Sequence, residues 1–186
     1  LPNPLTSGGS VLTDAAWKAY VFSTPRTATS EVVSLQFALN CKTCSLGHPS
    51  YPSSIQIQFS IYTAQNGLPL RQIYSTDQIP LTLTGPKQTF NISIPRWRLS
   101  ENSSYALIAK STASGGVKWA NVRSNGDVGD NIALDGLNGF TVTQALVSEN
   151  NGASYYSTEA NNNALLMSVN LGPTVSSVSP IYGSTS

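Results

Sequence analysis

The side chains that most often carry catalysis are scarce in this sequence of 186 residues. His48 is the single histidine, so a Ser-His-Asp triad would have to be built around the loop Leu46-Gly47-His48-Pro49. Most Asp and Glu residues fall in expected turns, not in the facing pair that a glycosidase needs. No glycine-rich phosphate loop that ends in Lys and Ser or Thr is present. We therefore expect that the chain is not an enzyme and needs no cofactor.

One group of acidic residues is a weak candidate for a metal site. Asp127, Asp130, Asn131 and Asp135 lie close together in a glycine-containing stretch. Carboxylate and amide oxygens are the ligands that Ca²⁺ prefers. Their spacing is not that of an EF-hand, and solvated loop acids are the favoured interpretation.

The two cysteines, Cys41 and Cys44, form a C-x-x-C motif. Such a motif can be a redox pair, half of a metal site or a small disulfide loop. A redox pair needs a helix N-terminus to lower the thiol pKa, whereas this motif follows an apolar, strand-like run. A zinc site needs two further ligands, and only one histidine is available. A local disulfide is favoured over free thiols or a metal site.

Aromatic side chains are the remaining candidates for a binding site. Trp97 lies between Arg96 and Arg98 and follows a proline, so it is the best exposed candidate for stacking on a sugar ring. A core or edge position is nevertheless the favoured interpretation for Trp97, and the ligand contact is the alternative. Trp17 alternates with small apolar residues and is expected in the core, while the position of Trp119 is ambiguous.

Two further segments could contribute ligand contacts. Tyr155 and Tyr156 lie between turn-rich stretches, and alternation should direct one of the two rings outward. The polar, glycine-rich segment Ser124–Asn138 is expected to be a long surface loop, and loops of that length are often functional.

Two asparagines, Asn91 and Asn102, lie in N-x-Ser patterns that accept N-linked glycans. The pattern is common by chance in a chain rich in Ser and Asn. It predicts glycosylation only if the protein is secreted by a eukaryotic cell.

The composition restricts the class of protein. Only 10% of the residues are charged, against roughly 25% in an average soluble protein. The net charge is +1 without a basic cluster, which argues against binding to nucleic acid. No stretch approaches the roughly 20 apolar residues of a membrane span. A surface of hydroxyls and amides fits a protein that is secreted or displayed at a cell surface.

Period-two alternation dominates the sequence and predicts half-buried β-strands. Ile55, Ile57, Phe59 and Ile61 should face a core, with the intervening polar residues in solvent. The same reasoning places Val33, Leu35, Phe37 and Leu39 on one buried face. Strands are expected over residues 17–22, 32–39, 55–62, 70–74, 81–83, 90–94, 105–110, 117–122, 139–147 and 164–170.

Turn residues separate these runs, most clearly in Gln65-Asn66-Gly67, because Asn and Gly tolerate positive φ. About ten short strands with regular turns predict an all-β fold, an antiparallel β-sandwich or jelly roll. We expect one sandwich domain over residues 1–170. Residues 171–186 are expected to form a linker and the first strand of a following domain.

Five segments follow one another between residues 16 and 122, with a Gly-x-Pro turn at the end of the third: Ala16–Phe22, Leu35–Leu39, Ile57–Pro69, Leu99–Ile108 and Lys118-Trp119. In this order they resemble the choice-of-anchor group of extracellular β-domains, especially its R type. The resemblance implies a surface-displayed module without common catalytic residues, so no site can be transferred.

The tail shows a second likeness. The run Pro173–Gly183 is similar to the opening strand of an IPT/TIG immunoglobulin-like domain. This implies a piece of a larger surface protein with several domains, and a Pro/Ser linker is the alternative.

These observations predict a non-catalytic structural or adhesive module of a larger cell-surface protein. It would act by contact with other surface proteins or with copies of itself. A carbohydrate-binding module, with glycans as partners and Trp97 and residues 124–138 as contacts, is the alternative function.

Overall fold

The structure, a computed structural model, describes residues 9–26, 29–41, 53–85, 87–112, 117–123, 141–157, 163–165 and 167–171. These residues form strands joined by turns, with no helix among them. The strands are β1 (Gly9–Val11), β2 (Trp17–Ser23), β3 (Ser30–Cys41), β4 (Ser53–Gln65), β5 (Leu68–Ser75), β6 (Ile79–Leu83), β7 (Lys87–Leu99), β8 (Ser104–Ser111), β9 (Val117–Arg123), β10 (Thr141–Ser148), β11 (Tyr156–Ser157), β12 (Asn163–Leu165) and β13 (Met167–Leu171).

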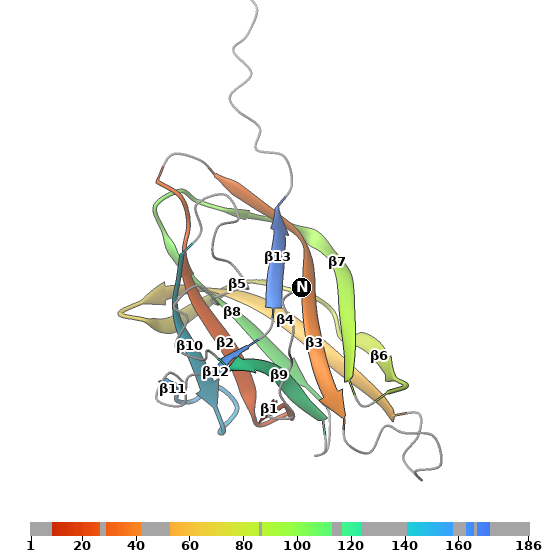
Figure 1. Cartoon of the computed structure of the whole chain (residues 1–186). Coiled ribbons are helices and arrows are strands. Elements are labelled where there is room, and N and C mark those ends of the chain that lie inside the picture. The colour runs from red at the N-terminus through yellow and green to blue at the C-terminus, as the bar shows by residue number, and fades with distance from the viewer. Residues whose placement is uncertain are drawn as a thin grey trace, which may run out of the picture.

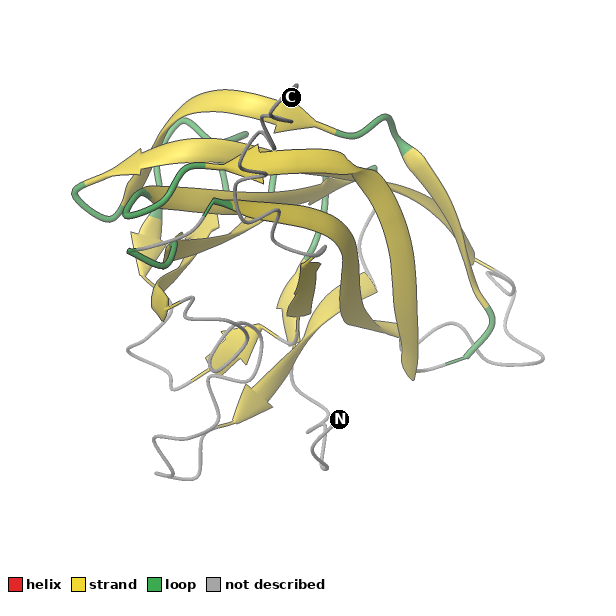
Figure 2. Ribbon diagram, turned by 90° about the horizontal axis from the view of Figure 1, so that it is seen from above, coloured by secondary structure: helices red, strands yellow, loops and turns green. Residues whose placement is uncertain are grey.

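Two antiparallel sheets account for all of these strands (Figure 1). The six-stranded sheet runs in the order β1-β9-β3-β13, with β12 beside β9 and β7 along the other edge of β3. The seven-stranded sheet runs β11-β10-β2-β8-β4-β5, and β6 pairs with the first half of β4. Seen from above, the strands curve around a shared interior (Figure 2). The expected all-β antiparallel sandwich is confirmed, and its finer class as a jelly roll stays a prediction.

The alternation of β4 explains why this segment is a half-buried strand. Ile55, Ile57, Phe59 and Ile61 point into the interior, as expected. Among the residues between them, Ser60 is an exception to the expected exposure, because it is buried beside Ser75 on the opposite face of the sheet.

Aromatic contacts join the two sheets across the core and also join neighbouring strands. Phe37 of β3 lies 5.1 Å from Phe59 of β4 in the opposite sheet, measured between ring centroids, and 5.5 Å from Phe90 of β7 in its own sheet. Tyr74 of β5 stacks on Trp97 of β7 at 5.9 Å. Burial of these rings removes apolar surface from water, which is the main force that holds the sheets together.

A register irregularity in β3 and β7 changes which side chains face the core. The pairing passes from Ser34 opposite Ser93 to Val32 opposite Trp97, so β7 has extra residues at this point. Alternation restarts after a bulge, and a proline such as Pro95 is tolerated there. As a result, Val32 is buried instead of the expected Val33.

The turn between β4 and β5 has the geometry that its sequence predicts. Asn66 and Gly67 have φ values of 53° and 76°. Positive φ at both central residues is typical of the tight hairpin turn that matches the twist of the strands.

A second apolar cluster lies on the face of the seven-stranded sheet that points away from the core, which we call the outer face. Its buried members are Ala19 and Val21 of β2, Ala106 and Ile108 of β8, and Leu146 of β10. The partly buried side chains of Trp17, Tyr62, Ala64 and Tyr155 pack against them. The central strands β2 and β8 are therefore packed on both faces.

The described part of the chain contains no helix that could cross a membrane. Residues 124–138, the tail from residue 172 and the side chain of Trp119 lie outside the described residues. The predicted surface loop, the domain boundary and the IPT/TIG-like strand therefore stay predictions.

Candidate functional site

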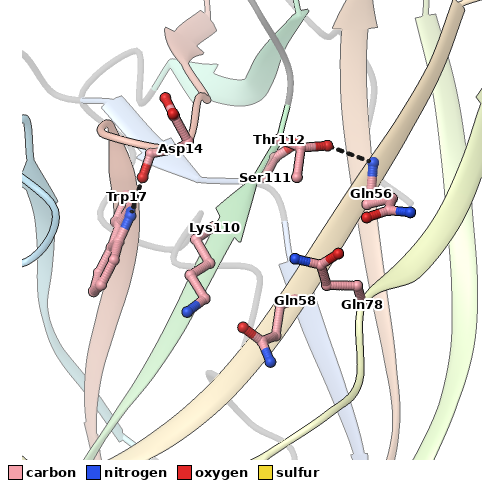
Figure 3. A pocket seen from close by; sticks show the side chains of 8 residues that line it. All are labelled: Asp14, Trp17, Gln56, Gln58, Gln78, Lys110, Ser111 and Thr112. Carbon is pink, nitrogen blue, oxygen red and sulfur yellow. Dashed lines mark hydrogen bonds between the residues drawn. The ribbon is translucent and has the colours of Figure 1, made fainter.

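A pocket of about 210 Å³ lies at one end of the outer face, beside the second apolar cluster (Figure 3). The strands β2, β4 and β8 are neighbours in the sheet, and each contributes side chains to the pocket. The loops before β2, after β5 and after β8 complete its wall. The lining residues are Asp14, Trp17, Gln56, Gln58, Gln78, Lys110, Ser111 and Thr112.

Trp17 supplies the one large ring of the pocket wall, and two segments hold it in place. Its indole Nε1 donates a hydrogen bond to the backbone oxygen of Asp14 at 2.6 Å. Gly152 packs directly against the edge atoms Cζ3 and Cε3 of the ring, so closely that a Cβ at this position would overlap them. The indole is therefore held at one orientation while part of its surface borders the pocket.

The turn that carries Gly152 is fixed by a small polar network. The hydroxyl of Ser148 accepts the backbone N–H of Gly152 at 2.9 Å and donates to Oδ1 of Asn150 at the same distance. Asn150 also bonds Ser154 in both directions, through its side-chain amide and its carbonyl oxygen. Ser148 is fully buried, so its bonds are shielded from water. These hydrogen bonds fix the conformation of the turn that packs behind Trp17.

Lys110 of β8 projects over Trp17 from the neighbouring strand. Its ammonium nitrogen lies 5.1 Å from the centre of the indole, within the range of a cation–π contact. The residue is only partly exposed. The pocket thus contains a cation that lies over a π-surface.

Three glutamine side chains give the pocket donors and acceptors without charge. The amide nitrogen of Gln58 donates to the backbone oxygen of Thr76 at 2.7 Å, which orients the group. Its oxygen lies on the Lys110 side of the amide in Figure 3. Gln56 and Gln78 are exposed at the rim. Each amide can both donate and accept hydrogen bonds.

The combination suits binding better than catalysis. A flat apolar ring can support one face of a ligand, while amides and hydroxyls bond its polar edge. Among the described residues that line the pocket, Asp14 is the one carboxylate, and its Oδ1 accepts the N–H of Ala15 at 2.8 Å. An acid–base pair of carboxylates cannot be assembled from these residues.

Trp97 lies in the core, which is the interpretation that the sequence favoured, so its alternative role as a ligand contact is wrong. It is 2% exposed and stacks on Tyr74 inside the core. The irregularity beside Pro95 turns the ring inward and leaves Arg96 and Arg98 outside, where both contact Glu31. Arg96 and Arg98 therefore indicate the solvent-exposed side of β7, and the tryptophan between them points to the opposite side.

Trp17 was expected in the core, and this prediction is wrong. It does alternate with Ala19 and Val21, as the sequence indicates, but all three lie on the outer face. Tyr20 and Phe22 occupy the core face of the same strand. Both faces of β2 are apolar, so alternation alone could not distinguish the core side from the pocket side.

The tyrosine pair lies near the second apolar cluster and not in the pocket. Tyr155 is partly buried in the cluster, and burial raises the pKa of its phenol, as it does for Tyr62. Tyr156 is 49% exposed, and a hydrogen bond to Glu149 raises its pKa. One ring of the pair does face outward.

The remaining candidates are exposed or lie outside the described residues. The side chains of Asn91 and Asn102 are exposed, and glycosylation at either stays a prediction. Cys41 is buried at the end of β3 and is not a free thiol, whereas Cys44 lies outside the described residues, so their pairing stays a prediction.

The calcium candidates Asp127, Asp130, Asn131 and Asp135 also fall outside the described part of the chain, as does His48. Within the described ranges, His, Cys, Asp and Glu nowhere form a group of three or more that could hold a metal ion.

The sequence contained part of the signal for the pocket. Alternation in β4 correctly directs Gln56 and Gln58 outward, and amide side chains on one sheet face are typical of a polar binding surface. What joins them to Trp17 is the strand order, in which β8 lies between β2 and β4. Strand order between segments so distant in sequence is not contained in local pattern.

No family model matches this chain, and no curated protein is similar to it in sequence. The resemblances to a choice-of-anchor domain and to the start of an IPT/TIG domain therefore stay predictions.

Proposed function

We propose that this chain is a non-catalytic carbohydrate-binding module that acts outside the cell. The observation that carries the proposal is the pocket in which Trp17 lies beside Gln56, Gln58, Gln78 and Lys110. A sugar ring has an apolar face of C–H groups and an edge of hydroxyls. The indole fits the first and the amides fit the second, so the pocket offers both kinds of contact at once.

The position of the pocket supports the same function. It lies on a sheet whose central strands are packed on both faces, and Trp17 is supported by Gly152 from behind. A preformed site binds with a smaller loss of conformational entropy than a mobile loop does. The many hydroxyl and amide side chains of the chain agree with binding of a ligand rich in hydroxyls outside the cell.

The test is binding of the purified chain to a glycan array and to insoluble polysaccharides, followed by calorimetry with the best ligand. Trp17→Ala should reduce affinity at least tenfold, which corresponds to about 1.4 kcal/mol. Tyr156→Ala is the matched control, because it removes an exposed ring outside the pocket. Equal affinity of the Trp17→Ala variant and the native chain would contradict the proposal.

A second candidate function is contact with other surface proteins or with copies of this chain. The edge strand β5 hydrogen-bonds to β4 along one side, and its Leu68 and Leu70 are 47% and 65% exposed. Figure 1 shows the β4–β5 hairpin projecting from the side of the molecule. An open strand edge with apolar side chains can pair with another chain.

Solution size tests this second function. Analytical ultracentrifugation should show concentration-dependent association that Leu70→Lys removes. Thr82→Lys, an exposed change on β6, serves as the control. A chain that stays monomeric at every concentration would leave no support for self-association.

A further inference from the structure

We propose that the saccharide bound in the Trp17 pocket is acidic, and that Lys110 pairs with its carboxylate while the sugar ring lies against the indole. This inference rests on the proposed carbohydrate-binding function and adds the chemical class of the ligand.

Lys110 is placed for this role by the pairing of β8 with β4. It lies directly opposite Gln58, and both side chains point to the outer face, where the pocket opens. Its ammonium group extends over Trp17 at 5.1 Å from the ring centre. A ligand ring that approaches the indole therefore meets this ammonium first.

The charge of Lys110 is not neutralised by an acid in the described part of the chain. The ion pairs found there join Glu31 to Arg96 and Arg98, on the six-stranded sheet. Asp14 lines the same pocket, but its carboxylate accepts the N–H of Ala15 and is turned away from the Lys110 nitrogen in Figure 3. The ammonium can exchange its contact with the ring for a ligand carboxylate.

The partly enclosed position makes this charge selective. An ion pair beside an indole is less screened by water and salt than a pair on an open surface. The amide groups of Gln56, Gln58 and Gln78 would bond the hydroxyls of an acidic sugar as readily as those of a neutral one. Lys110 is thus the residue that would discriminate between the two classes.

The test uses oligosaccharides that contain uronic or sialic acid, each paired with its carboxyl methyl ester, in calorimetric titrations against the native chain. The ester keeps the stereochemistry and removes the charge. We expect the acid form to bind at least tenfold more tightly at low salt, with a preference that decreases as salt is added. Lys110→Gln should abolish the preference, so that the variant binds the acid and its ester with equal affinity.

Arg26→Gln is the matched control, because it removes an exposed cation beyond the opposite end of β2 and should keep the preference. If the Lys110→Gln variant loses its folded circular dichroism spectrum, the salt dependence of the native chain decides the matter. Equal binding of acids and esters, or a preference that survives Lys110→Gln, would overturn this inference and leave the proposed function standing. Failure of every acidic and neutral saccharide to bind would overturn both.

Discussion

Trp17 owes its orientation to a residue that has no side chain. Gly152 has φ of +80°, and a Cβ built there would lie 2.7 Å from Cε3 of the indole. The backbone conformation and the close approach both require glycine at this position. A change at a residue outside the pocket lining should therefore alter the pocket.

Gly152→Ala should displace the indole and reduce saccharide affinity by at least tenfold. Gly67→Ala is a close control, since Gly67 also has positive φ, but its Cβ would meet only the flexible end of Gln144. Both variants should lose about 1–2 kcal/mol of stability from backbone strain. Calorimetry and tryptophan fluorescence separate the two, and an unchanged affinity in Gly152→Ala would show that the indole tolerates displacement.

Trp97 and Trp17 should differ in how much they contribute to the free energy of unfolding. Trp97 is fully enclosed by the core, so Trp97→Ala leaves a cavity and should lower the free energy of unfolding by about 3–5 kcal/mol. Trp17 is partly exposed, so the same change there should cost less. Urea denaturation followed by circular dichroism measures both, and a larger loss for Trp17→Ala would contradict the assignment of Trp97 to the core.

At the scale of elements, hydrogen bonds of Thr24 connect the end of β2 to the turn between β7 and β8. Its hydroxyl lies 2.7 Å from the backbone oxygen of Ser100 and accepts the N–H of Ser103 at 2.9 Å. A further backbone bond joins Thr24 N–H to the oxygen of Ser103. The side chain of Thr24 is buried, so these bonds are partly shielded from water.

Thr24→Val keeps the shape of the side chain and removes its hydroxyl. Because the oxygen of Ser100 and the N–H of Ser103 lose this partner at a part-buried position, we expect the free energy of unfolding to fall by about 1–2 kcal/mol. Thr63→Val provides the comparison, since the bond from its hydroxyl to the oxygen of Arg71 is long, at 3.4 Å, and near the surface. Thr24→Val should melt at a clearly lower temperature than Thr63→Val. Equal melting temperatures would argue against a stabilising role of the Thr24 hydroxyl.

The elements themselves follow closely from local pattern. Alternation in β4 and the Asn66-Gly67 turn predict that hairpin because side-chain direction and turn geometry depend only on neighbouring residues. Pattern is insufficient at β7, where alternation restarts beside Pro95 and turns Trp97 inward. A bulge depends on how two distant strands pair, so the segment alone does not specify it.

At the scale of the whole molecule, one buried cation affects stability. Lys18 lies on the core side of β2 and is 3% exposed. Burial lowers its pKa from 10.5 to about 8, against an opposing effect of Glu149. The folded state therefore releases the proton at lower pH than the unfolded state does.

Stability should accordingly rise between pH 7.5 and 9.5, because the unfolded chain binds more protons in that window. The expected gain is on the order of 1–2 kcal/mol in the free energy of unfolding. Lys18→Met should be more stable at pH 7.5 and show no such rise. Measurements stop at pH 9.5 because tyrosines of the unfolded chain, with a pKa of about 10, ionise increasingly above it. A flat profile for the native chain would contradict the lowered pKa of Lys18.

The site was harder to predict than the fold because it depends on the order of strands in the assembled sheet. Gln56 and Gln58 could be placed outward from β4 alone, but Trp17 joins them only through the order β2-β8-β4. Local pattern identifies the faces of each strand and does not say which faces become neighbours. That information arises when the whole sheet assembles.

Because β2 and β8 are packed on both faces, they should be the last strands to separate when the protein unfolds locally. Backbone amides exchange with deuterium only when their strands separate, and these two strands are enclosed by the core on one side and by Ala19, Val21, Ala106 and Ile108 on the other. Their amides should be the slowest to exchange. Trp17 and Lys110 stand on those same strands, so these two residues of the binding site should stay side by side in every partial opening that leaves β2 paired with β8.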